Sequence, residues 1–528
     1  MMFRIKLVFL LIFFCSVISE QPPNIIIIVA DDLGWNDVQF HGSQQVPTPN
    51  LDALGRAGVH LNNYYVSPIC TPSRGALMSG KHPIHLGLQH DVIYAGEPWG
   101  LPLNITILPQ HLKNLGYATH AIGKWHLGFY KKEATPTMRG FDSHYGYWTA
   151  HEDYYDHTAQ SPVGWGTDFH NGLKTIRNTA GKYLTDLLAQ RAVEIIYKHN
   201  SSQPLFLYVA HIAVHIANSY ELFQAPPNYV NRFPHIKDAR RRIFAGMISA
   251  LDDSIGKIFM ALNETSMLEN SVIVFTTDNG GAAGGVDQSV GSNWPLRGSK
   301  YTLWEGGVKA NAIFWTSFLN KSHYNSYNYL MHICDWLPTL YSAAGGKVSD
   351  LGSIYGHDMW KSLLFNLPSP REEILHNIDP IWKNAALRRG DYKIVIGTVF
   401  NGKYDGWYPT IGNEKPDSTF SNTSPVEKIL KSKGWNLDKE KSYVITCRQP
   451  PPINKTHECI DIHSPCLFNI ADDPCEYNNL AKSNPKILKD LIERVAAWNK
   501  TAIPPGKVPP DPAANPVFHQ YAWEPWQD

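Results

Sequence analysis

Residues 24–32, Asn-Ile-Ile-Ile-Ile-Val-Ala-Asp-Asp, decide the fold that we expect for this chain. Residues 24–30 are almost continuously apolar and β-branched, which is typical of a strand buried on both faces of a parallel sheet. Two later runs, residues 205–210 and 271–277, have the same character, and the second leads directly into residues 278–281, Asp-Asn-Gly-Gly. We therefore predict a parallel sheet whose strands lie far apart in the sequence.

Helical patterns separate these strands. Residues 50–57 and 106–115 each end at a glycine, Gly58 and Gly116, and glycine is the residue that most often closes a helix. Residues 185–198 carry apolar side chains at helical spacing. Strands that alternate with helices predict an α/β domain with a large, mixed and mainly parallel sheet flanked by helices.

The last third of the chain differs in composition and in the length of its expected strands. It contains shorter strand-like runs, such as residues 392–396, together with many Pro and Asn residues and a cluster of cysteines. We therefore divide the chain into a larger α/β domain over residues 21–370 and a smaller α+β domain with an antiparallel sheet over residues 371–528. The proline-rich residues 504–516 are expected to form an extended tail, packed on the surface or loosely ordered.

Residues 1–20 have the features of a signal peptide. Arg4 and Lys6 precede an apolar run at residues 7–14, which is too short to be a convincing membrane span. Such a peptide directs the protein into the secretory pathway, and its cleavage after residue 20 would remove Cys15. We expect no membrane-spanning helix in the rest of the chain. The 47 basic and 47 acidic residues give no general attraction to nucleic acid.

Sequons and cysteines agree with this route. Cys447, Cys459, Cys466 and Cys475 are expected to form disulfides in an oxidising compartment, and three pairings are possible. Cys334 lies in an apolar context and is expected to be an inert buried thiol. The candidate N-glycosylation sites are Asn104, Asn200, Asn263, Asn320, Asn422, Asn454 and Asn499.

Acidic and amide side chains follow two of the expected strands. Asp31 and Asp32 end the first strand, and Asp278 and Asn279 follow the run at residues 271–277. Ligands gather at the carboxyl ends of parallel strands, so we expect these four side chains to converge. Oxygen donors without nearby His or Cys ligands suit calcium or magnesium better than zinc. The alternative for Asp31 and Asp32 is a helix cap or a turn.

Cys70 begins the pentapeptide Cys70-Thr71-Pro72-Ser73-Arg74 at the entry to an expected helix. A helix N-terminus presents backbone N–H groups and a favourable dipole to an anion, and Arg74 adds a positive charge one turn further on. A lone cysteine is more often structural than reactive, so its residue type alone is a weak indication of function.

Two segments resemble the signatures of a known enzyme family. Residues 70–80 look like the first signature of the type I sulfatases, and residues 116–128 are similar to the second. Residues 139–142 and 304–308 fit the arylsulfatase B-like, or N-acetylgalactosamine-4-sulfatase, group. The resemblance covers nearly the whole larger domain, which it identifies as the catalytic domain. It implies the alkaline-phosphatase-like fold of sulfatases and the hydrolysis of sulfate esters.

The resemblance also implies how the nucleophile is made. A formylglycine-generating enzyme would oxidise Cys70 to formylglycine, whose hydrate attacks sulfur, and Arg74 would orient this group. One calcium ion would lower the pKa of the nucleophile and polarise the sulfate. The residues that the resemblance assigns to this ion are Asp31, Asp32, Cys70, Asp278 and Asn279.

Further roles come from the same resemblance. Lys124 and Lys300 would bind sulfate oxygens, and His126 would act as the base for the hydrate hydroxyl. His215 would contact sulfate and protonate the leaving alcohol. His211, four residues earlier, is a rival for the role of His215, which we favour because of its sequence register. Defined protonation states of the two histidines predict an acidic pH dependence.

The substrate stays open between two classes. One is a glycosaminoglycan sugar sulfate such as N-acetylgalactosamine 4-sulfate, and the other is a small plant sulfate such as a glucosinolate. Residues 94–100 lack the cysteines that relatives carry there, and Glu97 and Trp99 could shape the mouth of the pocket. Residues 151–154 match a family segment near the substrate, although surface polarity explains them equally well.

Two other functions agree less well with the sequence. Phosphatases of the same superfamily carry Ser or Thr at the nucleophile and bind two zinc ions, whereas this chain has Cys70 in an intact motif. A secreted glycoprotein that binds without turnover would be expected to lose Cys70, Arg74, Lys124 or a calcium ligand, and all are present. We expect a lysosomal or secreted sulfatase.

Overall fold

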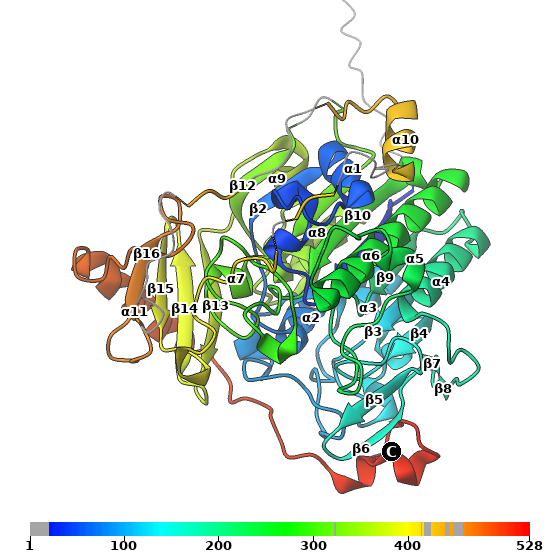
Figure 1. The fold of residues 1–528 in the computed structure, drawn as a ribbon, viewed down its shortest axis with the longest axis horizontal. Helices are drawn as coiled ribbons and strands as arrows, with labels where there is room; N and C mark the ends of the chain where they lie inside the picture. The colour runs from blue at the N-terminus through cyan, green and yellow to red at the C-terminus, as the bar shows by residue number, and fades with distance from the viewer. Residues whose placement is uncertain (1–20, 322–323, 413, 417–423, 439–443, 448–457) are drawn as a thin grey trace, which may run out of the picture.

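A computed structural model describes residues 21–321, 324–412, 414–416, 424–438, 444–447 and 458–528. Its centre is a mixed sheet of ten strands in the order β12-β2-β11-β10-β1-β9-β3-β4-β7-β8 (Figure 1). In that order the strands are Ser326–His332, Val59–Tyr65, Ala312–Thr316, Ser271–Thr277, Asn24–Ala30, Leu205–Ala210, Ala118–Lys124, Ser143–Tyr147, His170–Asn171 and Lys174–Thr175. The predicted large, mixed and mainly parallel sheet is confirmed.

The three apolar runs of the sequence form the middle of this sheet. β1 pairs in parallel with β10 on one side and with β9 on the other. Every residue of β1 is buried, because helices pack over the sheet and leave neither of its faces open at this point. The limits of β1, β9 and β10 agree with the predicted runs at residues 24–30, 205–210 and 271–277.

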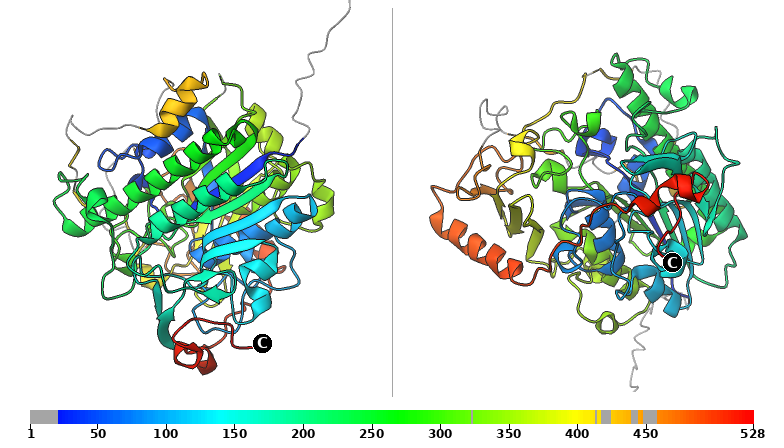
Figure 2. Two further views of the ribbon diagram at one scale, coloured as in Figure 1. Left: turned by 90° about the vertical axis from the view of Figure 1, so that its right-hand side faces the viewer. Right: turned by 90° about the horizontal axis from the view of Figure 1, so that it is seen from below.

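Two groups of helices pack against the sheet (Figures 1 and 2). The first group consists of α1 (Pro49–Ala57), α4 (Leu184–Lys198), α5 (Pro227–Val230), α6 (Ala239–Glu264) and α10 (Pro425–Ser432). The second consists of α2 (Cys70–Ser79), α3 (Leu108–Asn114), α8 (Trp336–Ala343) and α9 (Trp360–Phe365). α1, α3 and α4 lie where helices were predicted.

A four-stranded antiparallel sheet stands beside the larger layer (Figure 1). Its strands are β13 (Glu373–Asp379), β14 (Asn384–Arg389), β15 (Tyr392–Ile396) and β16 (Cys466–Asn469), and α11 (Pro485–Asn499) packs against it. The cysteines pair as Cys447 with Cys475 and Cys459 with Cys466, one of the three possible arrangements.

Two segments beyond residue 370 return to the larger layer. α10 packs on α1 and α6, and its Val426 and Leu430 are buried in the main core. The chain after α11 runs back beneath the molecule (Figure 2), where Asp511 N donates to Gly96 O and the buried Trp523 follows. The proline-rich residues 504–516 are therefore packed on the surface. A division of the chain at residue 370 stays a prediction.

A β-hairpin and a short helix lie outside the two sheets and the two helix groups. β5 (Thr158–Ser161) and β6 (Gly164–Thr167) form an antiparallel hairpin, and α7 (Glu305–Val308) is a single short helix close to the four-stranded sheet. None of the helices in the described ranges is both long and apolar enough to cross a membrane.

We expect Asp252 to be the acidic side chain on α6 that matters most for stability. Its carboxylate accepts hydrogen bonds from Asn50 N at 3.0 Å and Leu51 N at 2.8 Å, and so satisfies donors at the start of α1. Asp252→Ala leaves these donors buried and unpaired, which costs about 2–3 kcal/mol in the free energy of unfolding. The matched control is Asp253→Ala, which removes a partly exposed ion pair with Arg232 and costs about 1 kcal/mol or less. Chemical denaturation measures both values, and equal losses would contradict this prediction.

Candidate active site

The ends of β1 and β10 bring four polar side chains together. Ala30 lies opposite Thr277 in the parallel register, so Asp31 and Asp278 leave the sheet at the same level. Oxygen atoms of Asp31, Asp32 and Asp278 and the sulfur of Cys70 all lie within 4.8 Å of one another. Asn279 joins this group, because its Nδ2 donates to Asp32 Oδ1 at 2.7 Å. The predicted convergence of the two strand ends is present in the structure.

This cluster has the properties of a cation site. Asp278 Oδ1 and Asn279 Oδ1 are buried and have no hydrogen-bond partner among the described residues. Burial, and then the neighbouring Asp31 carboxylate, raise the pKa of Asp278. Unpaired buried oxygens and crowded carboxylates are costly unless a positive charge lies between them. The donors are oxygens apart from Cys70, so the residues present fit a hard cation such as calcium.

Cys70 is the first residue of α2 and faces the carboxylates. Its Sγ lies 3.7 Å from Asp31 Oδ1 and donates toward it. Burial raises the pKa of the Cys70 thiol well above its usual range. The reactive form of cysteine is the thiolate, so an unmodified Cys70 is a poor nucleophile in this place. The position suits a cysteine that is converted to another group before it acts.

Arg74 and Lys124 supply positive charge beside Cys70. Arg74, one turn along α2, donates to Asp278 Oδ2 from Nε at 3.0 Å and from Nη2 at 2.7 Å. Lys124, the last residue of β3, donates from Nζ to Asp31 Oδ2 at 2.5 Å. Each cation is buried and paired with a carboxylate of the cluster, as buried charges must be.

Lys300 and His215 form a second contact with the cluster. Lys300 Nζ lies 2.8 Å from Asp32 Oδ2, 2.9 Å from Asp287 Oδ2 and 3.2 Å from His215 Nε2. His215 Nδ1 donates to Ile216 O at 2.7 Å, so its Nε2 carries the lone pair that accepts from Lys300. Burial, and then Lys300, lower the pKa of His215.

The structure distinguishes His215 from His211. His211 Nε2 lies 2.9 Å from Ser254 Oγ on α6, whereas His215 lines the cavity above Cys70. Tyr154 Oη donates to His215 O at 2.8 Å and holds it in place. Tyr154 and Glu152 are fully buried, so surface polarity does not account for residues 151–154.

His126 approaches Cys70 from the loop after β3. Its Nε2 donates to Ile93 O at 3.0 Å, which leaves the lone pair on Nδ1. That Nδ1 is buried and has no partner within the described ranges. Burial, and then Lys124, lower the pKa of His126 well below its ordinary value. His126 is therefore a neutral imidazole with a free basic nitrogen.

A cavity of about 550 Å³ opens onto these groups. Cys70, His126, His215 and Lys300 lie among its lining residues. His151, from the segment that matched the family near the substrate, also lines it. The polar lining residues that were not predicted from the sequence include Gln160, Ser161, Asp287, Gln288 and Tyr301.

These unpredicted residues come from strand β5 and from loops distant in the sequence, which meet only in the fold. Asp287 and Gln288 both have left-handed backbones, at φ 51° and 58°, after the turn at Gly284 and Gly285. Glycines followed by polar residues are the signal in the sequence that could have indicated this turn. Glu97, which was expected at the mouth of the pocket, is absent from the described lining. Its carboxylate instead accepts a hydrogen bond from Trp99 Nε1 at 2.8 Å.

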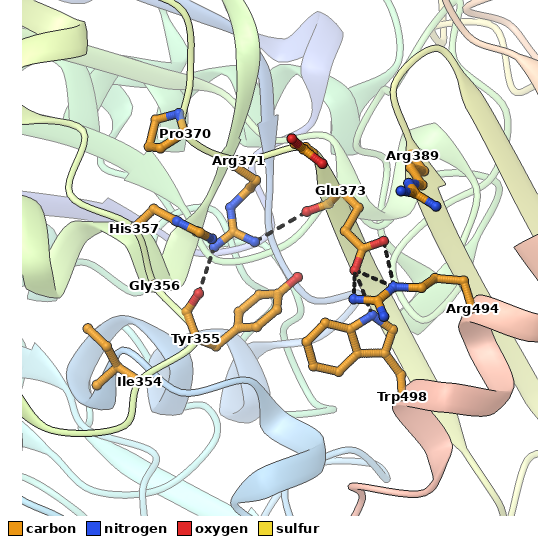
Figure 3. Close-up of a pocket in the computed structure, with 11 residues that line it drawn as sticks. Ile354, Tyr355, Gly356, His357, Pro370, Arg371, Glu373, Arg389, Arg494 and Trp498 are labelled. Carbon is orange, nitrogen blue, oxygen red and sulfur yellow. Dashed lines mark hydrogen bonds and ion pairs between the residues drawn. The ribbon is translucent and has the colours of Figure 1, made fainter.

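A second cavity, of about 500 Å³, lies beside the four-stranded sheet (Figure 3). Figure 3 shows its Arg494 held by the Glu373 carboxylate, at 2.8 and 2.9 Å from Nε. Arg371, also on its wall, donates to Asp335 Oδ2 at 2.9 Å. The described lining of this cavity contains no cysteine, so it lacks the candidate nucleophile that the cavity at Cys70 has.

The sulfatase family model matches residues 23–346, which include the carboxylate cluster, Cys70, both lysines, and the cavity histidines His126, His151 and His215. The chain belongs to the sulfatase family. Arylsulfatase J of Mus musculus is 40% identical over 532 residues, which cover 96% of this chain and 81% of that protein. Human N-acetylgalactosamine-6-sulfatase is 32% identical over 311 residues, 56% of this chain and 57% of that protein.

Solved structures agree with this assignment. The crystal structure of Ps i-CgsB superposes with a TM-score of 0.71 at 28% identity, covering 92% of this chain and 94% of that one. The fold is the alkaline-phosphatase-like fold of the sulfatases, as the resemblance implied. The sulfatase is a sulfate ester hydrolase, and the phosphatase alternative is rejected.

We expect the carboxylate cluster to bind calcium measurably in the purified protein. A cation that binds only the folded state stabilises it, so chelation should lower Tm by several degrees and calcium should restore it. Asp278→Asn should remove this calcium-dependent difference, whereas Asp350→Asn, at an exposed position, should retain it. Thermal denaturation with and without calcium makes the comparison, and a calcium effect that survives Asp278→Asn would contradict the assignment.

Proposed function

We propose that this sulfatase uses calcium and a formylglycine made from Cys70 to remove sulfate from sugars of glycosaminoglycans, such as N-acetylgalactosamine 4-sulfate. One observation carries the proposal. Cys70 lies at the N-terminus of α2, within reach of three carboxylates and beside two lysines, at the end of a cavity. That combination provides a cation site and an anion site around a single side chain.

When bound, calcium polarises the sulfate ester, and formylglycine supplies the nucleophilic oxygen. Lys124 and Lys300 bind the sulfate oxygens. Each lysine is paired here with a carboxylate that we assign to the cation, Asp31 or Asp32. A bound cation and a bound sulfate therefore satisfy both members of each pair.

Two histidines take part in the proton transfers of the reaction. Nδ1 of His126 is the free basic atom beside Cys70, so it accepts the proton released from the nucleophile. Nε2 of His215 receives a hydrogen bond from Lys300, which places an ammonium proton next to the imidazole. Together Lys300 and His215 provide the proton for the leaving alcohol. Arg74 donates to the Asp278 carboxylate and so fixes the start of α2 relative to the carboxylate cluster.

The names of the relatives support a sugar substrate. Human N-acetylgalactosamine-6-sulfatase is among the similar proteins, and Ps i-CgsB was solved in complex with k-i-k-neocarrahexaose. A small plant sulfate such as a glucosinolate is the second candidate. Chondroitin 4-sulfate and chondroitin 6-sulfate oligosaccharides form the matched pair that decides the position of the sulfate.

We place the enzyme in the secretory pathway, lysosomal or secreted, where a formylglycine-generating enzyme modifies it. Two disulfides support an oxidising compartment. Among the sequon asparagines, Asn263 is partly buried, and the exposed ones are Asn104, Asn200, Asn320 and Asn499. Asn422, Asn454 and the signal peptide at residues 1–20 lie outside the described residues.

We expect mass spectrometry of the peptide that contains Cys70 to show formylglycine when the protein is made in a host with the modifying enzyme. Cys70→Ala should lower kcat on an aryl sulfate by at least about 10³-fold, because it removes the nucleophile. Cys334→Ala is the matched control, since Cys334 is the other described cysteine outside a disulfide and is also buried. Unmodified Cys70 together with full turnover would contradict the proposal.

We expect the sulfatase to stay active well below neutral pH. The pKa of His126 is lowered below 6.5, so the imidazole remains an unprotonated base as the pH falls through that value. The acidic limb of the kcat/KM profile should therefore lie below pH 6.5. A profile measured on an aryl sulfate tests this, and an acidic limb centred at or above 6.5 would contradict the role of His126.

A further inference from the structure

Two exposed aromatic rings lie together next to the catalytic cavity. Trp165 on β6 and Tyr220, in the loop that follows β9, are stacked with centroids 5.6 Å apart and an interplanar angle of 25°. Half of each side chain is open to solvent, 50% for Trp165 and 51% for Tyr220. Adjacent aromatic surfaces of this size commonly mark a binding site.

Both rings are held in place by their polar atoms. Trp165 Nε1 donates to Thr158 Oγ1 at 2.7 Å. Tyr220 Oη lies 2.6 Å from Asp153 Oδ2 and 2.7 Å from Asp156 Oδ2. Since the polar tips are satisfied inside the protein, the rings present their apolar surface to solvent. A ligand that stacks on them loses little binding energy to ordering of the side chains.

The β5–β6 hairpin that carries Trp165 is also fixed. A Cβ at Gly164 would lie 2.7 Å from Pro516, and one at Gly166 would lie 2.5 Å from it, so this face of the hairpin is closed by the C-terminal segment. Thr167 N donates to Tyr521 O at 2.8 Å at the end of β6. Figure 1 shows the hairpin beside the C-terminus. Trp165 lies on the opposite, open face.

The aromatic pair is continuous with the cavity. Gln160 lies directly opposite Trp165 in the antiparallel register, so their side chains share one face and their Cβ atoms are about 5 Å apart. Ser219 precedes Tyr220 and donates to Gln160 Oε1 at 2.8 Å. Both Gln160 and Ser219 line the cavity at Cys70. Each ring is therefore directly adjacent to a residue that lines the cavity.

We propose that Trp165 and Tyr220 form a platform for a sugar ring of an extended saccharide substrate. The sulfated residue enters the cavity at Cys70 while a neighbouring residue of the same chain lies against the platform. A sugar ring has an apolar face of C–H groups, which stacks on an aromatic ring, and a rim of hydroxyl groups. The exposed amide of Gln160, whose NH2 has no partner among the described residues, is placed to donate to such a hydroxyl.

This inference rests on the proposed sulfatase function and narrows its substrate. It makes the natural substrate an oligosaccharide or polysaccharide sulfate rather than a small sulfate that fits inside the cavity. A small aryl sulfate reaches the reacting groups without touching the platform, so the two kinds of substrate respond differently to changes at Trp165.

The test compares Trp165→Ala, Trp165→Phe and a control, Phe518→Ala, in protein whose formylglycine content is verified. Phe518 is also aromatic and exposed, on the neighbouring C-terminal segment. The probes are chondroitin 4-sulfate and 6-sulfate tetrasaccharides, the matching sulfated monosaccharides and an aryl sulfate. For the tetrasaccharide that is cleaved, Trp165→Ala should raise KM about tenfold with little change in kcat. Trp165→Phe should stay within about threefold of the parent, and Phe518→Ala should have no effect.

The outcomes separate the two proposals. If Trp165→Ala leaves KM for the tetrasaccharide unchanged, the platform is wrong, while aryl sulfate turnover still supports the sulfatase function. If Trp165→Ala impairs the monosaccharide and aryl sulfates as much as the tetrasaccharide, Trp165 has a structural role and the platform is again wrong. If the modified parent hydrolyses none of the sulfate esters, the proposed function itself is overturned.

Discussion

Three carboxylates are buried side by side where β1 and β10 end, and the rest of the site is arranged to balance their charge. In a low dielectric, like charges at this distance repel strongly unless cations lie between them. Each carboxylate has a close cationic partner, and these pairs are Asp31 with Lys124, Asp32 with Lys300 and Asp278 with Arg74. Arg74 also lies 3.6 Å from Asp31 and so joins two of the carboxylates. Positive groups are thereby held around Cys70 before any substrate arrives. A metal cation and a sulfate together can replace the partners in the two lysine pairs, because that exchange leaves neither the lysines nor the carboxylates unpaired.

The C-terminal part of the chain supports this arrangement although the described cavity lining contains none of its residues. Lys300 lies in the sequence between Arg297 and Glu305. Arg297 Nε donates to Asp405 O at 2.8 Å, and Glu305 pairs with Lys393 of β15 at 2.9 Å. Both ends of the segment that carries Lys300 are thus anchored on residues beyond 370. The backbone that carries Lys300 is thereby supported on both sides, and the contacts of its ammonium group with Asp32 and Asp287 hold the side chain itself.

The central strands could be predicted residue by residue, because a β-branched run that is buried on both faces leaves a continuous pattern in the sequence. α6 could not. It contains glycines, and Gly256 is required where Asn50 approaches a would-be Cβ to 2.9 Å, so packing rather than helix propensity stabilises this helix. The same difference holds in the site. Cys70 lies in a contiguous motif, whereas Asp287 lines the cavity only because distant loops meet there.

The ion pairs of the site also limit how tightly it can bind a bare sulfate. Lys300 already contacts Asp32 and Asp287, so a sulfate oxygen that reaches its ammonium group replaces a carboxylate instead of filling an empty position. Such an exchange contributes less to ground-state affinity than a new ion pair would. The affinity must then come largely from parts of the substrate that do not react. Binding energy from such remote contacts can be used to position the sulfate ester at the reacting groups. The rings of Trp165 and Tyr220 lie where a saccharide chain that extends from the cavity would make those contacts.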